Sequence, residues 1–202
     1  MKRLKCALAM LFCVLLLSAC GEPAAPAEAP LPGKTPYATF DYTHYASGGT
    51  AETYTAVILF EQSCSTFTSY QVAFSSCTCR DALVNYYSVC YVELLNTKPT
   101  AEQASIRSIT FGGNQGLWGD SNPNYYRRDY TEEYMDENFV QAFVGISMED
   151  IGAWGGYGTQ IEAVDADAVS GATVSTSNIT SMLQGLFAYH AANYYPDPEE
   201  TP

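Results

Sequence analysis

The run Tyr86-Tyr-Ser-Val-Cys-Tyr-Val-Glu-Leu-Leu95 is the most convincing β-strand in the chain. It is rich in β-branched and aromatic residues, which favour strands. Residues 53–60, 70–74 and 105–111 have the same character, and Gly112-Gly113 closes the last of them. Together these stretches predict an antiparallel meander with short turns.

Two helices are expected after these strands. Residues 131–143 place apolar side chains on one face, with Thr131 as a candidate N-cap and acidic residues that suit the helix dipole. Residues 177–194 carry a clear apolar stripe at helical spacing. The stripe consists of Ile179, Met182, Leu183, Leu186, Phe187 and His190, so His190 is expected in the core.

The pattern as a whole predicts an α+β fold, an antiparallel β-sheet with a few packed helices in a single domain. This domain is expected to span residues 37–195, with 196–202 as a C-terminal tail. Residues 116–126 are dense in Gly, Asn, Asp and Pro, and residues 152–158 are rich in Gly, so both are expected to be loops. Residues 159–164 are expected to form a short strand, and His44, in a polar segment, is expected on the surface.

The N-terminus is expected to lie outside this domain. Basic residues at positions 2, 3 and 5 precede an apolar run of 12 residues, Cys6 to Leu17, which is shorter than the roughly 20 residues of a membrane span. Residues 1–19 are therefore predicted to be a signal peptide. Leu17-Ser18-Ala19-Cys20 resembles the lipobox of bacterial lipoproteins, which implies that Cys20 is lipidated. An ordinary cleaved signal with an incidental cysteine is the alternative.

Residues 20–36 are rich in Pro and Ala and predict an extended tether. Two acyl chains on Cys20 would anchor the domain to the outward face of a bacterial cell membrane without spanning it. The chain has 9 basic and 22 acidic residues, and loss of the signal peptide would leave six basic residues and a net charge of −16. Such an acidic body argues against binding of nucleic acid.

Four cysteines remain after the signal: Cys64, Cys77, Cys79 and Cys90. In an exported protein, four cysteines are expected to form two disulfides, and three pairings of the four are possible. A bond between Cys77 and Cys79 would be strained on a strand, so each is expected to pair with Cys64 or Cys90. Reduced thiols remain an alternative. A four-thiolate metal site is a further alternative, although the spacings lack the usual C-x-x-C units.

The segment with the clearest chemistry is residues 167–175, Asp-Ala-Val-Ser-Gly-Ala-Thr-Val-Ser. A small, Gly-containing turn that opens a helix points unsatisfied N–H groups outward, and with the helix dipole it favours a phosphate. Gly171 and Ala172 allow close approach of a bulky group, while Ser170, Thr173 and Ser175 add hydroxyls. On these grounds alone, an ordinary helix start is the better interpretation.

This segment resembles the flavinylation motif D-x-x-S/T-G-A-T of the FMN-binding domain family, found in the sodium-pumping NADH:quinone reductase, the Rnf complex and surface lipoproteins. Every fixed position is filled, by Asp167, Ser170, Gly171, Ala172 and Thr173. The resemblance implies that a Mg-dependent flavin transferase joins FMN through its phosphate to Thr173. It covers residues 159–194 well, but the chain lacks the E-T-P-G-x-G-like loop of the respiratory subunits.

The resemblance implies a lipoprotein that exchanges electrons with membrane or surface redox partners, a carrier rather than a stand-alone oxidoreductase. A solute-binding or structural lipoprotein without flavin is the alternative, and a reductase for one exported substrate is a second. No Ser/His/Asp, H-x-x-H or paired-carboxylate arrangement is found, so no catalytic or metal-binding residues are predicted. Trp118 is expected either to stack on the flavin or to pack under its own loop.

Overall fold

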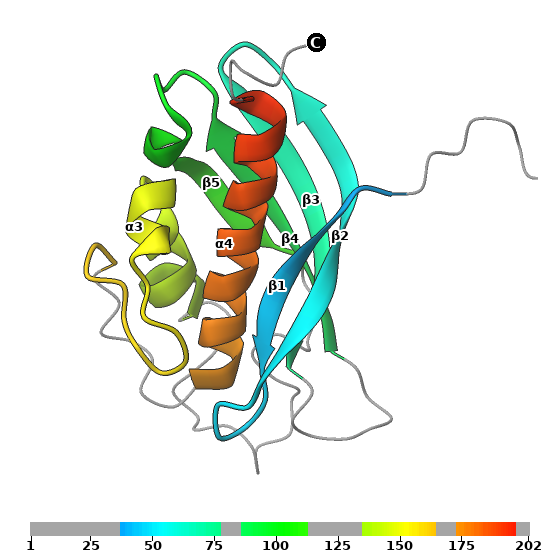
Figure 1. The fold of residues 1–202 in the computed structure, drawn as a ribbon, viewed down its shortest axis with the longest axis vertical. Helices are drawn as coiled ribbons and strands as arrows, with labels where there is room; N and C mark the ends of the chain where they lie inside the picture. The colour runs from blue at the N-terminus through cyan, green and yellow to red at the C-terminus, as the bar shows by residue number, and fades with distance from the viewer. Residues whose placement is uncertain (1–36, 78–85, 113–134, 165–172, 197–202) are drawn as a thin grey trace, which may run out of the picture. The chain divides into compact units, whose positions relative to one another are not determined.

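A meander of five antiparallel strands forms the centre of the fold in the computed structural model, which describes residues 37–77, 86–112, 135–164 and 173–196 (Figure 1). The strands lie side by side in chain order, as predicted. They are β1 (Thr39–Tyr45), β2 (Ala51–Ser63), β3 (Phe67–Cys77), β4 (Tyr86–Leu95) and β5 (Ile106–Phe111).

Helices cover one face of the sheet, which confirms the predicted α+β fold (Figure 1). The long helix α4 (Thr173–Tyr194) packs on β1 and β3, and the short helix α3 (Met148–Gly152) packs on α4. Three short helical turns complete the layer: η1 (Ala101–Gln103), η2 (Asp136–Val140) and η3 (Gln141–Phe143). None of the helices in the described ranges is long and apolar enough to cross a membrane.

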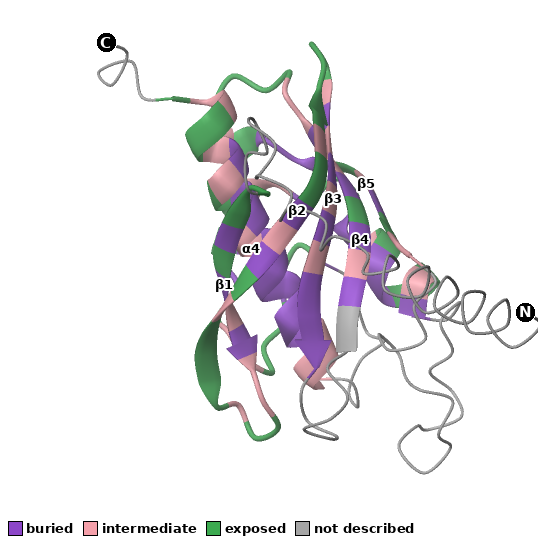
Figure 2. Cartoon of the chain, turned by 90° about the vertical axis from the view of Figure 1, so that its right-hand side faces the viewer, coloured by how far each residue is buried: buried purple, intermediate pink, exposed green. Residues whose placement is uncertain are grey.

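The period-two pattern of the strands places one set of side chains under the helices and the other set outward. Buried and more exposed residues alternate along the strands, as Figure 2 shows. Val72, Cys90 and Val92 on the inner face are fully buried. On the outer face Phe60 and Tyr91 remain 49% and 47% exposed, so the core lies between the sheet and the helices.

The predicted helix over residues 131–143 is confirmed as helical from residue 135 onward, although it is irregular. A π-helical turn, η2, passes directly into a 3-10 turn, η3. Of the five residues expected on one apolar face, Met135, Phe139, Val140 and Phe143 are buried, and Tyr134 lies outside the described residues. Thr131, the expected N-cap, lies outside the described residues.

The stripe of the last helix is confirmed, since all six of its members are buried, His190 included. The helix spans Thr173–Tyr194 and so begins four residues earlier than expected. The expected strand over 159–164 is wrong. The Val164 N–H returns to the Ile161 carbonyl at 2.9 Å, so these residues form a turn that cannot join a ladder, and both side chains enter the core.

Strand β1 is absent from the sequence predictions, and the expectation that His44 is a surface residue is wrong. Phe40, Tyr42 and His44 alternate along β1 and face the helices, and His44 is 1% exposed. Its ring stacks on Tyr54, with ring centroids 4.2 Å apart and an interplanar angle of 16°. Burial is possible because an imidazole presents flat apolar faces to an aromatic neighbour.

The described cysteines do not pair with one another, in contrast to the expected pairings. Cys64 and Cys90 are free thiols, whereas Cys77 is disulfide-bonded. Cys77 lies opposite Tyr86, four residues along β4 from Cys90. That offset is roughly 13 Å along a strand, whereas a disulfide needs Cα atoms within about 7 Å. Cys64 precedes β3 at its other end, and Cys79 is not among the described residues.

The contact between α4 and β1 is closest at Gly185. A Cβ placed there would lie 2.6 Å from the Asp41 carbonyl oxygen and 2.8 Å from Cδ2 of Phe40. No real Cβ is accommodated at such distances from main chain without a shift of the helix or the strand. Gly185 therefore allows the helix backbone to rest directly on the strand.

We expect Gly185→Ala to lower the free energy of unfolding by at least about 1 kcal/mol, because overpacking outweighs the better helix propensity of Ala. Gly152→Ala is the matched control, since a Cβ there meets nothing within 4 Å. The control should leave stability unchanged or slightly higher. Urea denaturation of both variants measures the difference, and equal stabilities would contradict the proposed contact.

Candidate functional site

The sheet divides at the end where α4 begins. Pairing between β2 and β3 stops at Val57 and Ala73, whereas β1 and β2 stay paired as far as Tyr45 and Ala51. Strands β3 and β4 likewise continue, to Cys77 and Tyr86. At this end the β1–β2 pair and the β3–β4 pair are therefore no longer joined by hydrogen bonds between β2 and β3. The main-chain groups that lose this ladder need other partners.

Tyr42 supplies one of these partners. Its hydroxyl donates to the Ser75 carbonyl at 2.8 Å and accepts the Ser75 N–H at 3.1 Å. The phenol thus replaces a neighbouring strand for one residue of β3. Because Tyr42 is on β1, it also joins the two hairpins.

Asn178, on the second turn of α4, joins the same two hairpins from the helix side. Its Oδ1 accepts the Tyr45 N–H at 2.6 Å, and its Nδ2 donates to the carbonyls of Tyr45 at 3.1 Å and Ser76 at 2.9 Å. One turn further on, Ser181 Oγ accepts the Thr43 N–H at 2.9 Å. These hydrogen bonds fix the first half of α4 against β1 and β3.

Thr173 occupies the first described position of α4 and is half-buried, as is Ser175. An α-helix leaves its first N–H groups without partners inside the helix, and the macrodipole adds partial positive charge there. No acidic residue lies in the first turn to offset it. The other motif residues, Asp167, Ser170, Gly171 and Ala172, and the predicted lipidation site Cys20 lie outside the described residues.

A glycine-rich loop, residues 155–158, lies against this first turn. The Gly158 N–H donates to Ser177 Oγ at 3.3 Å, and a Cβ on Gly158 would lie 3.6 Å from Cγ2 of Thr173. Gly158 has a φ of +74°, in the left-handed region that glycine adopts most readily. The loop can therefore approach Thr173 with its backbone.

Aromatic rings flank the loop. The Tyr45 ring lies 6.0 Å from that of Trp154, edge to face, and 5.6 Å from that of Tyr157. The Trp154 indole N–H donates to the Thr159 carbonyl at 3.1 Å, which fixes its orientation. The sequence reasoning missed these rings because it treated residues 152–158 only as a loop.

Buried polar side chains gather at this end of the core. They are His44, Ser75, Ser76, Ser88, Ser177, Asn178 and Ser181. Most have partners; Ser88 Oγ, for example, donates to Ser76 Oγ at 2.7 Å. Burial lowers the pKa of His44, and Glu52, opposite it on β2, partly offsets this. His44 is therefore neutral at physiological pH.

A second polar cluster lies at the other end of α4. Tyr70 Oη and His190 Nδ1 are 2.8 Å apart, while the Tyr189 and Tyr194 hydroxyls donate to Glu61 at 2.9 and 2.5 Å. Burial lowers the pKa of His190 to about 4 and raises that of Tyr70. Every hydroxyl here is used internally, so the cluster acts in packing.

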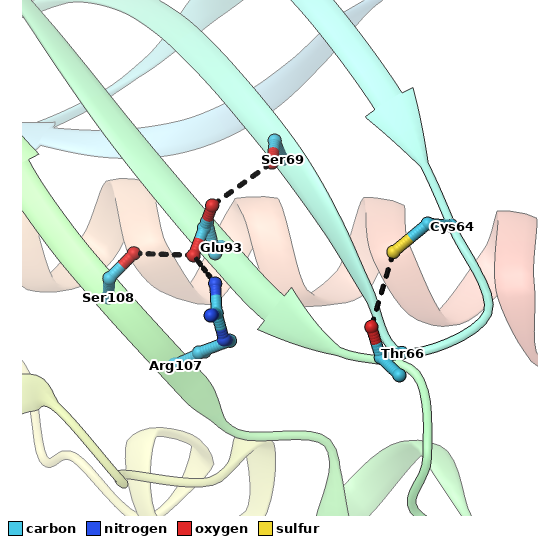
Figure 3. A network of polar contacts seen from close by, with 6 residues as sticks. All are labelled: Cys64, Thr66, Ser69, Glu93, Arg107 and Ser108. Carbon is cyan, nitrogen blue, oxygen red and sulfur yellow. Dashed lines mark hydrogen bonds and ion pairs between the residues drawn. The ribbon is translucent and has the colours of Figure 1, made fainter.

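The outer face of the sheet carries a surface network (Figure 3). Glu93 accepts from Ser69 at 3.3 Å and Ser108 at 2.9 Å and forms an ion pair with Arg107. Nearby Cys64 is exposed, and the hydrogen bond with the Thr66 side chain lowers the pKa of its thiol. Exposed pairs of this kind contribute little to stability. Within the described ranges, no group of three His, Cys, Asp or Glu side chains could hold a metal ion.

Comparison with known proteins identified no relative of this chain. The chain matches no family model, no curated protein and no solved structure. The function is therefore argued from the residues at the start of α4 and from the motif that precedes it.

We expect Asn178→Ala to lower the free energy of unfolding by about 3 kcal/mol, because main-chain groups of β1 and β3 lose their partner. Asn193→Ala is the control. Asn193 lies exposed on the same helix and donates only to the Tyr189 carbonyl, so its loss should cost under about 0.5 kcal/mol. Chemical denaturation measures both, and similar losses would disprove the bridging role of Asn178.

The lowered pKa of His190 predicts a pH dependence. Its pKa is about 4 when folded and 6.5 when unperturbed, so the unfolded chain binds more protons between these values. The contribution to stability is therefore complete above about pH 6.5 and is lost as the pH falls toward about 4.

Between about pH 7.5 and pH 5, we expect the wild type to lose about 2 kcal/mol more stability than His190→Gln. Denaturation curves at several pH values measure this difference. His44 titrates in both proteins, so its contribution cancels. Parallel pH profiles would show that His190 is not buried in its neutral form.

Proposed function

We propose that this domain carries FMN joined through its phosphate to Thr173 and that it moves electrons outside the cytoplasm. The observation that carries the proposal is the motif Asp167-x-x-Ser-Gly-Ala-Thr173, which ends at the start of a 22-residue helix. A phosphate ester at this position would lie at the positive end of the helix dipole.

The described residues fit a bound flavin nucleotide. Thr173 is half-buried rather than sealed, and no carboxylate of the first turn would repel a phosphate. The Gly158 backbone lies beside the Thr173 methyl group, and Ser177 holds that loop through its hydroxyl. The aromatic rings of Tyr45, Trp154 and Tyr157 pack together around the loop that contacts Thr173 and offer apolar surface on that side.

Attachment requires the Thr173 hydroxyl oxygen to form a bond to phosphorus. The hydroxyl loses its proton, and a leaving group departs from the phosphorus. An activated flavin donor would supply that leaving group as its own phosphorus–oxygen bond breaks, and a flavin transferase would catalyse the exchange. Bound FMN supplies the redox chemistry, and the protein supplies attachment, orientation and electrostatics. A covalent bond prevents loss of the cofactor to the medium.

The rest of the chain fits this role. Lipidation at Cys20 would hold the protein on the outward face of the cell membrane, and the tether of residues 20–36 would let the domain reach membrane or surface redox partners. The acidic body disfavours nucleic acid and favours cationic surfaces on partner proteins. We propose a redox carrier, since no catalytic arrangement is evident in the sequence.

Thr173→Ala is expected to abolish covalent flavin completely. The full chain is co-expressed with a flavin transferase, and intact mass and flavin fluorescence on a denaturing gel are measured. Thr176→Ala is the matched control, because its hydroxyl lies one turn further on and donates to the Thr173 carbonyl at 3.2 Å. The control should retain the flavin.

Absence of fluorescence and of added mass from the wild type would overturn the proposal. The motif would then be an ordinary helix start, and a solute-binding or structural lipoprotein would be the better description. Fluorescence retained in Thr173→Ala would instead mean that the attachment site lies elsewhere in the chain.

A further inference from the structure

Three buried side-chain atoms have no hydrogen-bond partner among the residues the structure describes: His44 Nε2, Ser75 Oγ and His190 Nε2. Leaving such a group unsatisfied costs about 1–3 kcal/mol, so each requires an explanation. Two of the three, His44 and Ser75, lie at the divided end of the sheet beside the start of α4. They are 1% and 6% exposed.

Asn178 fixes both residues relative to the helix. His44 precedes Tyr45, whose N–H and carbonyl bond to Asn178, and Ser75 precedes Ser76, whose carbonyl also bonds to Asn178. Asn178 follows Thr173 by five residues, or about 7.5 Å along the helix axis. A ribityl chain and three-ring system attached at Thr173 would be long enough to reach this place.

The surroundings of His44 suit a neutral hydrogen-bonding group. Tyr54 stacks on one face of its ring, and Glu52 is the charged residue opposite it on β2. Tyr42 and Tyr45 are its neighbours on β1, and α4 brings no acidic residue in its first turn. A neutral imidazole whose Nε2 carries the proton can donate to a carbonyl oxygen.

His190 has the same unpartnered atom in a different setting. It follows Thr173 by 17 residues, about 26 Å along the helix, and its Nδ1 is engaged by Tyr70. It therefore lies beyond the reach of a group held at Thr173, and it provides an internal control.

We infer that His44 Nε2 binds the polar edge of the flavin ring system and so orients the cofactor. This inference rests on the proposed attachment of FMN to Thr173. The pyrimidine edge of the ring carries carbonyl oxygens, which can accept a hydrogen bond from an Nε2 that carries the proton. His44 is a positioning residue, since the ring reaches the protein through the covalent bond at Thr173.

The test compares imidazole ¹⁵N resonances in the full chain, flavinylated as wild type and flavin-free as Thr173→Ala. The His44 Nε2 resonance is expected to shift between the two proteins, whereas the His190 resonances should stay in place. Unmoved His44 resonances in a protein that carries covalent flavin would overturn this inference and leave the proposed function intact. A wild type without flavin would overturn both.

Substitution gives a second readout. His44→Phe should retain denaturation-resistant flavin but shift its visible absorption and lower its midpoint potential, because a donor to the ring favours the electron-rich reduced form. His44→Gln keeps an N–H donor and should lie closer to the wild type. His190→Gln should leave the spectrum and the potential unchanged. Equal effects of the His44 and His190 variants would contradict a contact specific to His44.

Discussion

The attachment of α4 to the free edge of β1 is the interaction on which the rest of the structure depends. An edge strand presents unpaired N–H and carbonyl groups, and here three of them are bound: the Thr43 N–H by Ser181, and the N–H and carbonyl of Tyr45 by Asn178. Gly185 lets the helix rest on the strand further along. Because the helix is fixed at these points, the position of Thr173 at its start is fixed as well.

Much of the fold could be predicted from the sequence, because strands β2 to β5 and the stripe of α4 have clear apolar periodicity. Strand β1 was missed because Tyr42 and His44 are amphipathic, and such residues indicate neither core nor surface by themselves. Asn178 and Ser181 were missed for a similar reason, since polar residues on a helix usually face water. Their partners lie more than 130 residues away in the chain, which no local pattern reveals.

Only the motif residues at the start of the helix could be predicted as part of the candidate site. The motif located Thr173 and Ser175 at a helix start, because small and hydroxyl residues there have a local cause. The loop that contains Gly158 and the division of the sheet depend on packing and register between distant segments. The loop left only a weak signal in the sequence, a pair of glycines around Tyr157, and the register shift in β3 after Ser75 is visible only in the structure. The cysteine pairing failed for the same reason, since strand register decides which thiols can meet.

The burial of Cys90 has a consequence for how the chain must mature. Its thiol is fully enclosed, and burial raises its pKa to about 12, so the folded protein presents almost no thiolate to an oxidant. In the unfolded chain the same thiol is an ordinary competitor for Cys77. Where oxidant is present, folding therefore competes with disulfide formation. A chain that forms its sheet early avoids a disulfide between Cys90 and Cys77. The core then protects the thiol kinetically, without an enzyme to correct it.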